Sequence, residues 1–160
     1  MIISVQRFTF VVLFTNGKQK IMKGIIYGRV STNKQDHARQ VNSLQEWAKR
    51  NDVEVVEVFT EIVSGRKAGK DRAAFAAMIE YIRTNKIGII LISELSRIGR
   101  SPMDVQINIH KFVYEVGLDM YIHEQGLRAR DSKGEINSIF KLMTDMFANV
   151  AGMEVDQTRA

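Results

Sequence analysis

Two short segments of the sequence place arginine where it could act on a phosphate. Arg29 stands two residues before Ser31, and Arg97 stands three residues before Arg100. If a strand continues through Arg29 and Ser31, their side chains point to the same side, so one phosphate could meet a hydroxyl and a guanidinium. Arg97 and Arg100 share a face if they lie in a helical turn. Because the planar donor fork of arginine matches phosphate oxygens, these segments predict a phosphate site.

Each of these residues, considered alone, has a simpler structural explanation. A lone serine such as Ser31 most often caps the helix that follows it. Arg97 and Arg100 could form a solvated basic turn, and Arg72 could be an ordinary surface arginine. The combination favours a site, because these three arginines and Arg29 lie at or near loops that could converge. Converging like charges are costly without an anion between them, so we expect a bound phosphate.

The composition excludes several other kinds of chemistry. The sequence has no cysteine, which excludes disulfides, thiolate metal sites and cysteine nucleophiles. His37, His110 and His123 are far apart and share no metal-ligand spacing, so we expect no metal and no other cofactor. No glycine-rich phosphate loop is present, which argues against a flavodoxin-like small-molecule binder. The net charge of +5 permits nucleic acid as a partner.

The N-terminal segment differs in pattern from the rest of the chain. We expect residues 1–21 to be an extension that is not native, with Met22 as the natural start. The apolar run over residues 8–14 is too short to span a bilayer, and it lacks the basic start and cleavage site of a signal peptide. We therefore expect no membrane association and a cytoplasmic location.

Hydrophobic patterning predicts strands that alternate with helices. We expect strands over residues 24–30, 53–59, 87–93 and 118–122, and a loop over residues 61–70. We expect helices from Asn33 or Asp36 to about Asn51, from Asp71 past Ile82, from Ser101 to Gly117, and over residues 133–160. This order indicates an α/β domain with a mostly parallel central sheet flanked by helices. Functional loops leave the carboxyl ends of such strands, and Arg29 and Arg97 follow the first and third strands.

Two of the predicted helices carry more specific expectations. Ser101 should cap the third helix, Pro102 should lie in its first turn, and Gly117 should end it. The residues expected on its buried face are Val105, Ile109, Phe112, Val113 and Val116. The last helix has an apolar stripe of Ile136, Ile139, Phe140, Met143, Phe147 and Val150, widened by Leu142 and Met146. A wide apolar surface on a terminal helix predicts a partner subunit.

The motifs, in chain order, resemble the resolvase/invertase family of serine site-specific recombinases. The matching residues are Tyr27-Gly28-Arg29-Val30-Ser31-Thr32, Gln40, Ser64-Gly65, Asp71-Arg72 and Glu94-Leu95-Ser96-Arg97-Ile98-Gly99-Arg100-Ser101. The resemblance covers about residues 23–160. It implies a resolvase-like fold with a catalytic α/β core over residues 22–132, and a long C-terminal dimerisation helix that begins within residues 133–160.

The resemblance also implies a reaction and its residues. Ser31 matches the nucleophile that attacks a DNA phosphate without a metal, forms a 5′-phosphoserine link and releases the 3′-hydroxyl before the strands are exchanged and resealed. The other matching catalytic residues are Arg29, Arg72, Arg97 and Arg100, and the supporting or DNA-binding residues are Gln40, Ser64, Ser96 and Glu154. The group that takes the serine proton stays open. The implied partners are double-stranded DNA and further copies of the chain, in a homodimer and a synaptic tetramer, in the bacterial nucleoid and with no small-molecule substrate.

Three features depart from the family's pattern. Ser96 stands where many members have aspartate, so any role of that carboxylate is lost. Val155 follows Glu154 where arginine is frequent, and we expect one contact to DNA or to a partner subunit to be weaker. Family members usually continue into a separate DNA-binding domain, whereas this sequence ends within the long helix. We therefore expect a C-terminal DNA-binding domain to be absent from this chain.

Two neighbouring functions remain open at this point. The chain could be a non-catalytic DNA-binding or regulatory relative that acts through dimerisation, although the retained Ser31 and arginines argue against it. A nuclease would use the same serine without resealing. The nuclease predicts release of cut DNA, whereas the recombinase predicts a covalent adduct between protein and DNA.

Overall fold

The computed structural model describes residues 21–30, 34–62 and 72–159, which form one five-stranded sheet in the order β2-β1-β3-β4-β5. The strands are β1 (Met22–Val30), β2 (Val53–Ile62), β3 (Ile89–Ile92), β4 (Asp119–Ile122) and β5 (Leu127–Arg128). The first four are parallel to one another, and β5 is antiparallel to β4. The expected mostly parallel sheet is confirmed. The sequence does not predict strand β5, because two residues are too few to show a hydrophobic period.

Strand β2 is longer than the sequence predicts. The expected strand ends at Phe59 and leaves Glu61 in a loop, but Glu61 lies in β2, opposite Arg29 of β1. The strand continues because β1 runs alongside it and supplies partners for its backbone groups. The predicted loop is therefore wrong at its first residues, and a carboxylate is carried to the end of the sheet beside Arg29.

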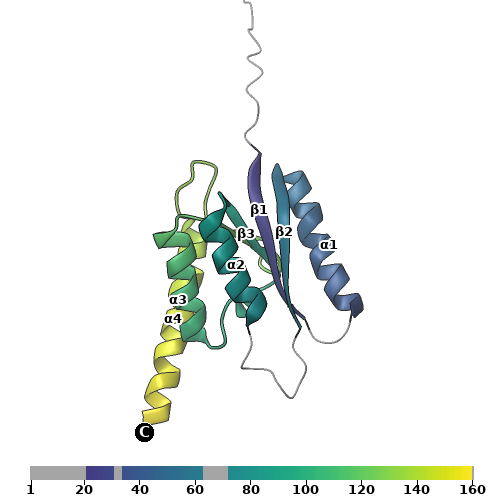
Figure 1. Ribbon diagram of the computed structural model, residues 1–160. Coiled ribbons are helices and arrows are strands. Elements are labelled where there is room, and N and C mark those ends of the chain that lie inside the picture. The colour runs from purple at the N-terminus through teal and green to yellow at the C-terminus, as the bar shows by residue number, and fades with distance from the viewer. Residues whose placement is uncertain (1–20, 31–33, 63–71, 160) are drawn as a thin grey trace, which may run out of the picture.

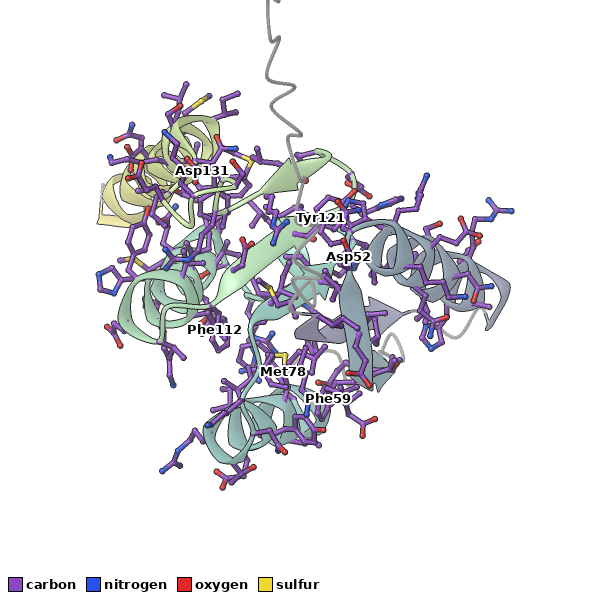
Figure 2. All side chains as sticks on the ribbon, turned by 90° about the horizontal axis from the view of Figure 1, so that it is seen from above. Asp52, Phe59, Met78, Phe112, Tyr121 and Asp131 are labelled. Carbon is purple, nitrogen blue, oxygen red and sulfur yellow. The ribbon has the colours of Figure 1, made fainter. Side chains whose placement is uncertain are left out.

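Helices cover both faces of the sheet. They are α1 (Lys34–Arg50), α2 (Ala73–Thr84), the short 3-10 helix η1 (Leu95–Arg97), α3 (Pro102–Ile109) with its π-helical continuation η2 (His110–Glu115), and α4 (Ser138–Arg159). Helix α1 packs on one face, α2 and α3 pack on the other, and α4 lies beside α3 (Figures 1 and 2). Within the described ranges, no helix combines the length and apolar character that crossing a membrane requires.

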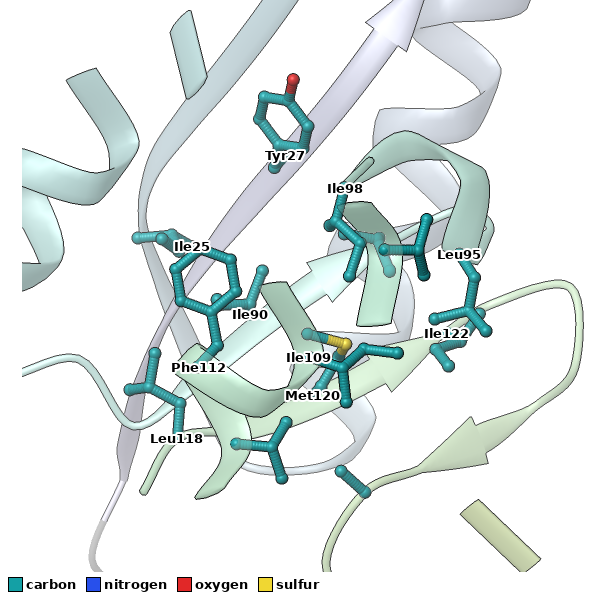
Figure 3. Close-up of a cluster of buried hydrophobic side chains, with 14 of the residues drawn as sticks. Ile25, Tyr27, Ile90, Leu95, Ile98, Ile109, Phe112, Leu118, Met120 and Ile122 are labelled. Atoms are coloured by element: carbon teal, nitrogen blue, oxygen red, sulfur yellow. The ribbon is translucent and has the colours of Figure 1, made fainter. Parts of the chain in front are cut away.

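The central strand β3 is buried on both sides, as its apolar run predicts. Ile90 and Ile92 belong to the hydrophobic cluster under α2 and α3, and Ile89 and Leu91 belong to the cluster under α1. Tyr27 of β1 also packs in the first cluster, and Figure 3 shows its hydroxyl pointing away from the other labelled side chains. The core therefore fixes the ring of Tyr27 and leaves its hydroxyl at one end of the sheet.

Helix α3 starts as the sequence predicts and ends differently. The Ser101 hydroxyl accepts the backbone N–H of Asp104 at 3.2 Å, which confirms the cap. The continuation η2 is a π-helix, in which the Val116 N–H bonds to the carbonyl of Lys111. The wider turn carries Val116 to the surface, where it is 52% exposed, so its expected burial is wrong. Gly117, with a φ of 81°, ends the segment as predicted.

Helix α4 begins at Ser138 rather than at residue 133. The Asp131 carboxylate accepts two backbone N–H groups from the turn that follows it, and the Asn137 side chain caps the helix by accepting the N–H of the second helical residue. Such local side-chain bonds compete with helix formation. Of the expected apolar stripe, Phe140 is buried and Met143 and Phe147 pack against the core, whereas Ile139 and Val150 are exposed. The two residues expected to widen it, Leu142 and Met146, are exposed too.

Candidate active site

The carboxyl ends of β1 and β3 bring the predicted arginine segments to one end of the sheet. Arg29 is the last but one residue of β1, and Arg97 lies in η1, which follows β3. Arg29 and Tyr27 are two residues apart in one strand, so both side chains point to the face covered by α2 and α3. The expectation that these loops converge at a sheet end is met for these residues.

Arg72 connects three elements at this end of the sheet. Its Nη2 donates to the Tyr27 hydroxyl at 3.3 Å and to the backbone carbonyl of Arg97 at 3.1 Å. Its Nη1 lies 3.4 Å from the Asp104 carboxylate, and its guanidinium carbon lies 3.8 Å from the centre of the Phe75 ring. Only 13% of the side chain is exposed. Arg72, the residue before the start of α2, therefore contacts β1, η1 and α3.

Arg97 is held by its side chain and by its backbone. Its guanidinium forms an ion pair with Glu94, three residues earlier, and both side chains are about one-quarter exposed. The carbonyl of the next residue, Ile98, accepts a hydrogen bond from the buried Asn108 side chain at 2.7 Å. Ser96, which replaces the carboxylate frequent in the family, is exposed. Glu94 thus supplies a carboxylate partner to Arg97 that position 96 does not.

Arg100 is the most accessible arginine of this group. Its side chain is exposed, while its backbone N–H donates to the Asp104 carboxylate at 2.8 Å. The residue before it is Gly99. A side chain would not fit at that position, because a Cβ there would lie 2.4 Å from the backbone nitrogen of Val105. A hollow of about 550 Å³ lies beside this turn, and its lining is Arg72, Phe75, Ala76, Ile79, Arg100, Ser101 and Asp104.

Glu61 belongs to this cluster, although the sequence did not indicate it. It is 8% exposed, and its two carboxylate oxygens accept the backbone N–H groups of Ala74 and Phe75 at 3.4 and 3.2 Å. These N–H groups belong to the first turn of α2, which has no side-chain cap at its own start. Glu61 therefore caps α2 from the neighbouring strand and fixes the helix that follows Arg72.

The Tyr27 phenol stands between this carboxylate and Arg72. Burial raises the pKa of Tyr27 above its usual 10.0, and the hydrogen bond and charge of Arg72 act in the opposite direction. The protonated phenol donates to Glu61 at 3.5 Å and accepts from Arg72. The pKa of Tyr27 is higher in the folded state than in the unfolded state, so the protonated phenol stabilises the fold below pH 10. This stabilisation is lost as the pH rises through the folded-state pKa.

Replacing Glu61 by alanine should destabilise the fold, because two N–H groups at the start of α2 lose their acceptor. We expect the free energy of unfolding to fall by about 1–2 kcal/mol, the usual cost of losing an N-cap. Urea denaturation measures this loss. Glu57→Ala is the matched control, since Glu57 is an exposed carboxylate of the same strand whose hydrogen bond among the described residues is to the adjacent backbone N–H. Equal losses in both variants would contradict the capping role.

The remaining predicted residues lie elsewhere or cannot be placed. Ser31 and Ser64 fall outside the described residues. Gln40 lies in α1, which packs on the other face of the sheet from the arginine cluster, and no described contact joins it to that cluster. Glu154 belongs to α4, and its side chain lies outside the described part of the chain. The structure thus gathers Arg29, Arg72, Arg97 and the Arg100 backbone with Tyr27, Glu61 and Asp104.

The chain is similar to known proteins in sequence and in structure. A family model described as "Resolvase, N terminal domain" matches residues 24–160. A resolvase family site-specific recombinase from Streptococcus pneumoniae has a similar structure, with a TM-score of 0.67 and 26% identity over 86% of this chain and 91% of that one. The N-terminal catalytic domain of TP901-1 integrase shares the fold with a TM-score of 0.66, at 20% identity over 84% and 98% of the two chains. The C-terminal catalytic domain of ISC1926 TnpA, an IS607-like serine recombinase, has a TM-score of 0.53 and 25% identity over 64% and 70%.

Proposed function

The chain belongs to the resolvase family, whose N-terminal domain spans residues 24–160, and from this premise we propose that it catalyses site-specific DNA recombination through Ser31. The observation that supports this best is the arginine cluster. Arg29 lies next to the last residue of β1, two residues before Ser31 in the sequence, and Arg72 bonds to the backbone of Arg97 at the same end of the sheet. A phosphate carried to this edge would meet guanidinium groups next to a hydroxyl nucleophile.

The proposed reaction is a reversible phosphoryl transfer. The Ser31 oxygen loses its proton and attacks a phosphorus atom of the DNA backbone, so that a serine–phosphate bond forms at the 5′ side. The bond from phosphorus to the 3′ oxygen breaks, and that oxygen takes up a proton and leaves as a 3′-hydroxyl. Attack by a 3′-hydroxyl of the exchanged strand reverses these steps. Fixed guanidinium groups stabilise the negative charge that develops on the phosphate oxygens.

Trapping the covalent intermediate tests this proposal. The probe is a pool of short duplexes with a randomised centre, each nicked in one strand so that a cleaved piece diffuses away, and labelled at the 3′ end. The reaction is run at low salt, where phosphate contacts bind most tightly. We expect labelled DNA that stays attached to the protein under denaturing conditions, with the link mapped to Ser31 by mass spectrometry. Bound DNA without any adduct would favour the non-catalytic relative, and cut DNA without an adduct would favour a nuclease.

The proposed assembly is a homodimer formed through α4, which pairs into a tetramer when two DNA sites are brought together. Four apolar side chains of α4 support the dimer, since each is at least half exposed: Ile139, Leu142, Met146 and Val150. Apolar surface of this kind on a helix that extends past the rest of the domain is typical of a protein interface (Figure 1).

A charge placed in this surface should weaken the dimer. Leu142→Glu would bury a carboxylate without a partner, and we expect the dimer dissociation constant to rise about tenfold or more. Sedimentation velocity over a concentration series measures the change. Ser132→Glu is the control, because it adds the same charge to an exposed residue of the turn before α4. A dimer that is equally stable in both variants would place the interface elsewhere.

A further inference from the structure

Asp104 lies at the centre of the arginine cluster, in the first turn of α3. One oxygen of its carboxylate, Oδ2, accepts from Arg72 Nη1 at 3.4 Å and from the backbone N–H of Arg100 at 2.8 Å. The other oxygen, Oδ1, lies 3.4 Å from the side-chain nitrogen of Asn108. One carboxylate therefore contacts a guanidinium from before α2, a backbone amide of the loop after η1, and its own helix.

The contacts of Arg72 complete the same framework. Its Nη1 is directed to Asp104, and its Nη2 is shared between the Tyr27 hydroxyl and the Arg97 carbonyl. Its Nε is enclosed and has no hydrogen-bond partner among the described residues. A phosphate at this guanidinium would compete with the three groups that it already contacts. Arg100 differs, because its side chain is exposed.

The pair formed by Asp104 and Arg72 holds both ends of one turn. Arg72 fixes the carbonyl of Arg97, and Asp104 fixes the N–H of Arg100, so the segment between these two arginines is tied at its first and last residue. The Gly99 backbone, pressed against Val105, leaves this segment little room to move. The direction in which the Arg97 and Arg100 side chains leave the backbone therefore depends on the pair.

We propose that Asp104 is a positioning residue of this site, and that it acts with Arg72 to set the Arg97–Arg100 turn rather than to contact the phosphate. This inference rests on the proposed recombinase function. Positioning matters for rate because a displacement of about 1 Å can cost about 100-fold. Because its carboxylate already holds Arg72 and the Arg100 N–H, Asp104 acts through these arginines. The proposal assigns the same indirect role to Arg72.

Four variants test the proposal through the rate of covalent adduct formation at saturating DNA: Asp104→Asn, Asp104→Ala, Arg72→Ala and the double variant of the last two. Asp104→Asn keeps an acceptor for the Arg100 N–H and loses the charge that holds Arg72, whereas Asp104→Ala loses both. We expect rates lowered about tenfold and about 100-fold, with DNA affinity nearly unchanged. The double variant Asp104→Ala/Arg72→Ala should be no slower than the worse single variant, since coupled residues are not additive. Additive losses, or a loss confined to DNA affinity, would overturn the proposal.

A neutral substrate separates positioning from phosphate contact. In a duplex whose backbone carries methylphosphonate linkages, a methyl group replaces one charged oxygen at the reacting phosphorus. The penalty of Arg100→Ala should shrink on this substrate, because a residue that contacts the charge has less to stabilise. The loss of rate caused by Asp104→Asn or by Arg72→Ala should be the same on this substrate as on the ordinary duplex. A penalty of Arg72→Ala that shrinks as much as that of Arg100→Ala would overturn the proposal.

Amide hydrogen exchange tests the same framework without any reaction. The Arg100 N–H should exchange at least about tenfold faster in Asp104→Ala, because it loses its acceptor. Asp145→Ala is the control, since Asp145 forms an exposed ion pair with Lys141 on α4. Unchanged exchange at Arg100 would overturn the positioning role. Absence of a covalent adduct in the wild type, with the exchange result as expected, would instead count against the recombinase function.

Discussion

Replacing Ser31 by alanine should abolish the covalent protein–DNA adduct, because the oxygen that would form the new bond to phosphorus is removed. We expect DNA cleavage to fall about 10⁴-fold or more, the scale seen when a nucleophile is deleted. Binding of DNA should change little, since phosphate affinity comes from the cationic side chains that remain. Adduct yield on a denaturing gel, measured with the nicked duplex pool, reports the first effect, and a filter-binding titration reports the second.

The control for this prediction is a serine that the fold leaves exposed. Ser132 lies in the turn before α4, outside the arginine cluster, so Ser132→Ala should form the adduct at the wild-type rate. An adduct of equal yield in Ser31→Ala would remove Ser31 as the nucleophile. The link would then have to be mapped to another hydroxyl.

Replacing Arg97 by alanine should produce the second largest effect, a rate of cleavage lowered about 10²–10³-fold or more, as is typical when one electrostatic donor is lost. Two physical causes act in the same direction. A guanidinium that would stabilise the phosphate charge is removed, and the Glu94 carboxylate paired with it is left without its partner. The stranded negative charge then opposes the approach of a phosphate.

The second cause has its own test. Because Glu94 adds repulsion only when Arg97 is absent, Arg97→Ala/Glu94→Gln should be faster than Arg97→Ala alone. Arg83→Ala is the matched control, since Arg83 also pairs with a glutamate three residues earlier, Glu80, but on an exposed face of α2. Single-turnover cleavage compares the variants. Unchanged cleavage in Arg97→Ala would take Arg97 out of the site, and a double variant as slow as the single one would exclude the repulsion.

Much of the architecture is determined by local sequence patterns. The apolar run at residues 87–93 predicts a strand covered on both faces, and the structure forms the shorter strand β3 within it and buries all four residues of that strand. The cap at Ser101, the proline after it and the stop at Gly117 depend on hydrogen bonds and backbone angles within a few residues. For the same reason, the placement of Arg29 and Arg97 at strand ends follows from the order of strands and helices alone.

Contacts between distant elements could not be predicted in this way. Asp104 and Glu61 lie 32 and 11 residues from Arg72 along the chain. Their roles depend on the packing of α3 and on the extension of β2 beside β1. The hydrophobic pattern also predicted that Val116 is buried, whereas it is exposed. The π-helical winding before it is set by how η2 packs and not by its hydrophobic spacing.

The sequence by itself determined which side chains are available for phosphate chemistry and which end of the sheet they approach, because strand order and loop position follow from short-range periodicity. The tertiary structure alone decided how Arg72 is paired, because its partner Asp104 lies 32 residues away in a separate element. Arg97 pairs locally with Glu94, three residues earlier, and the Arg100 side chain is exposed. The Arg72 pair depends on a distance of a few ångströms between separate elements, and no spacing along the chain encodes such a distance.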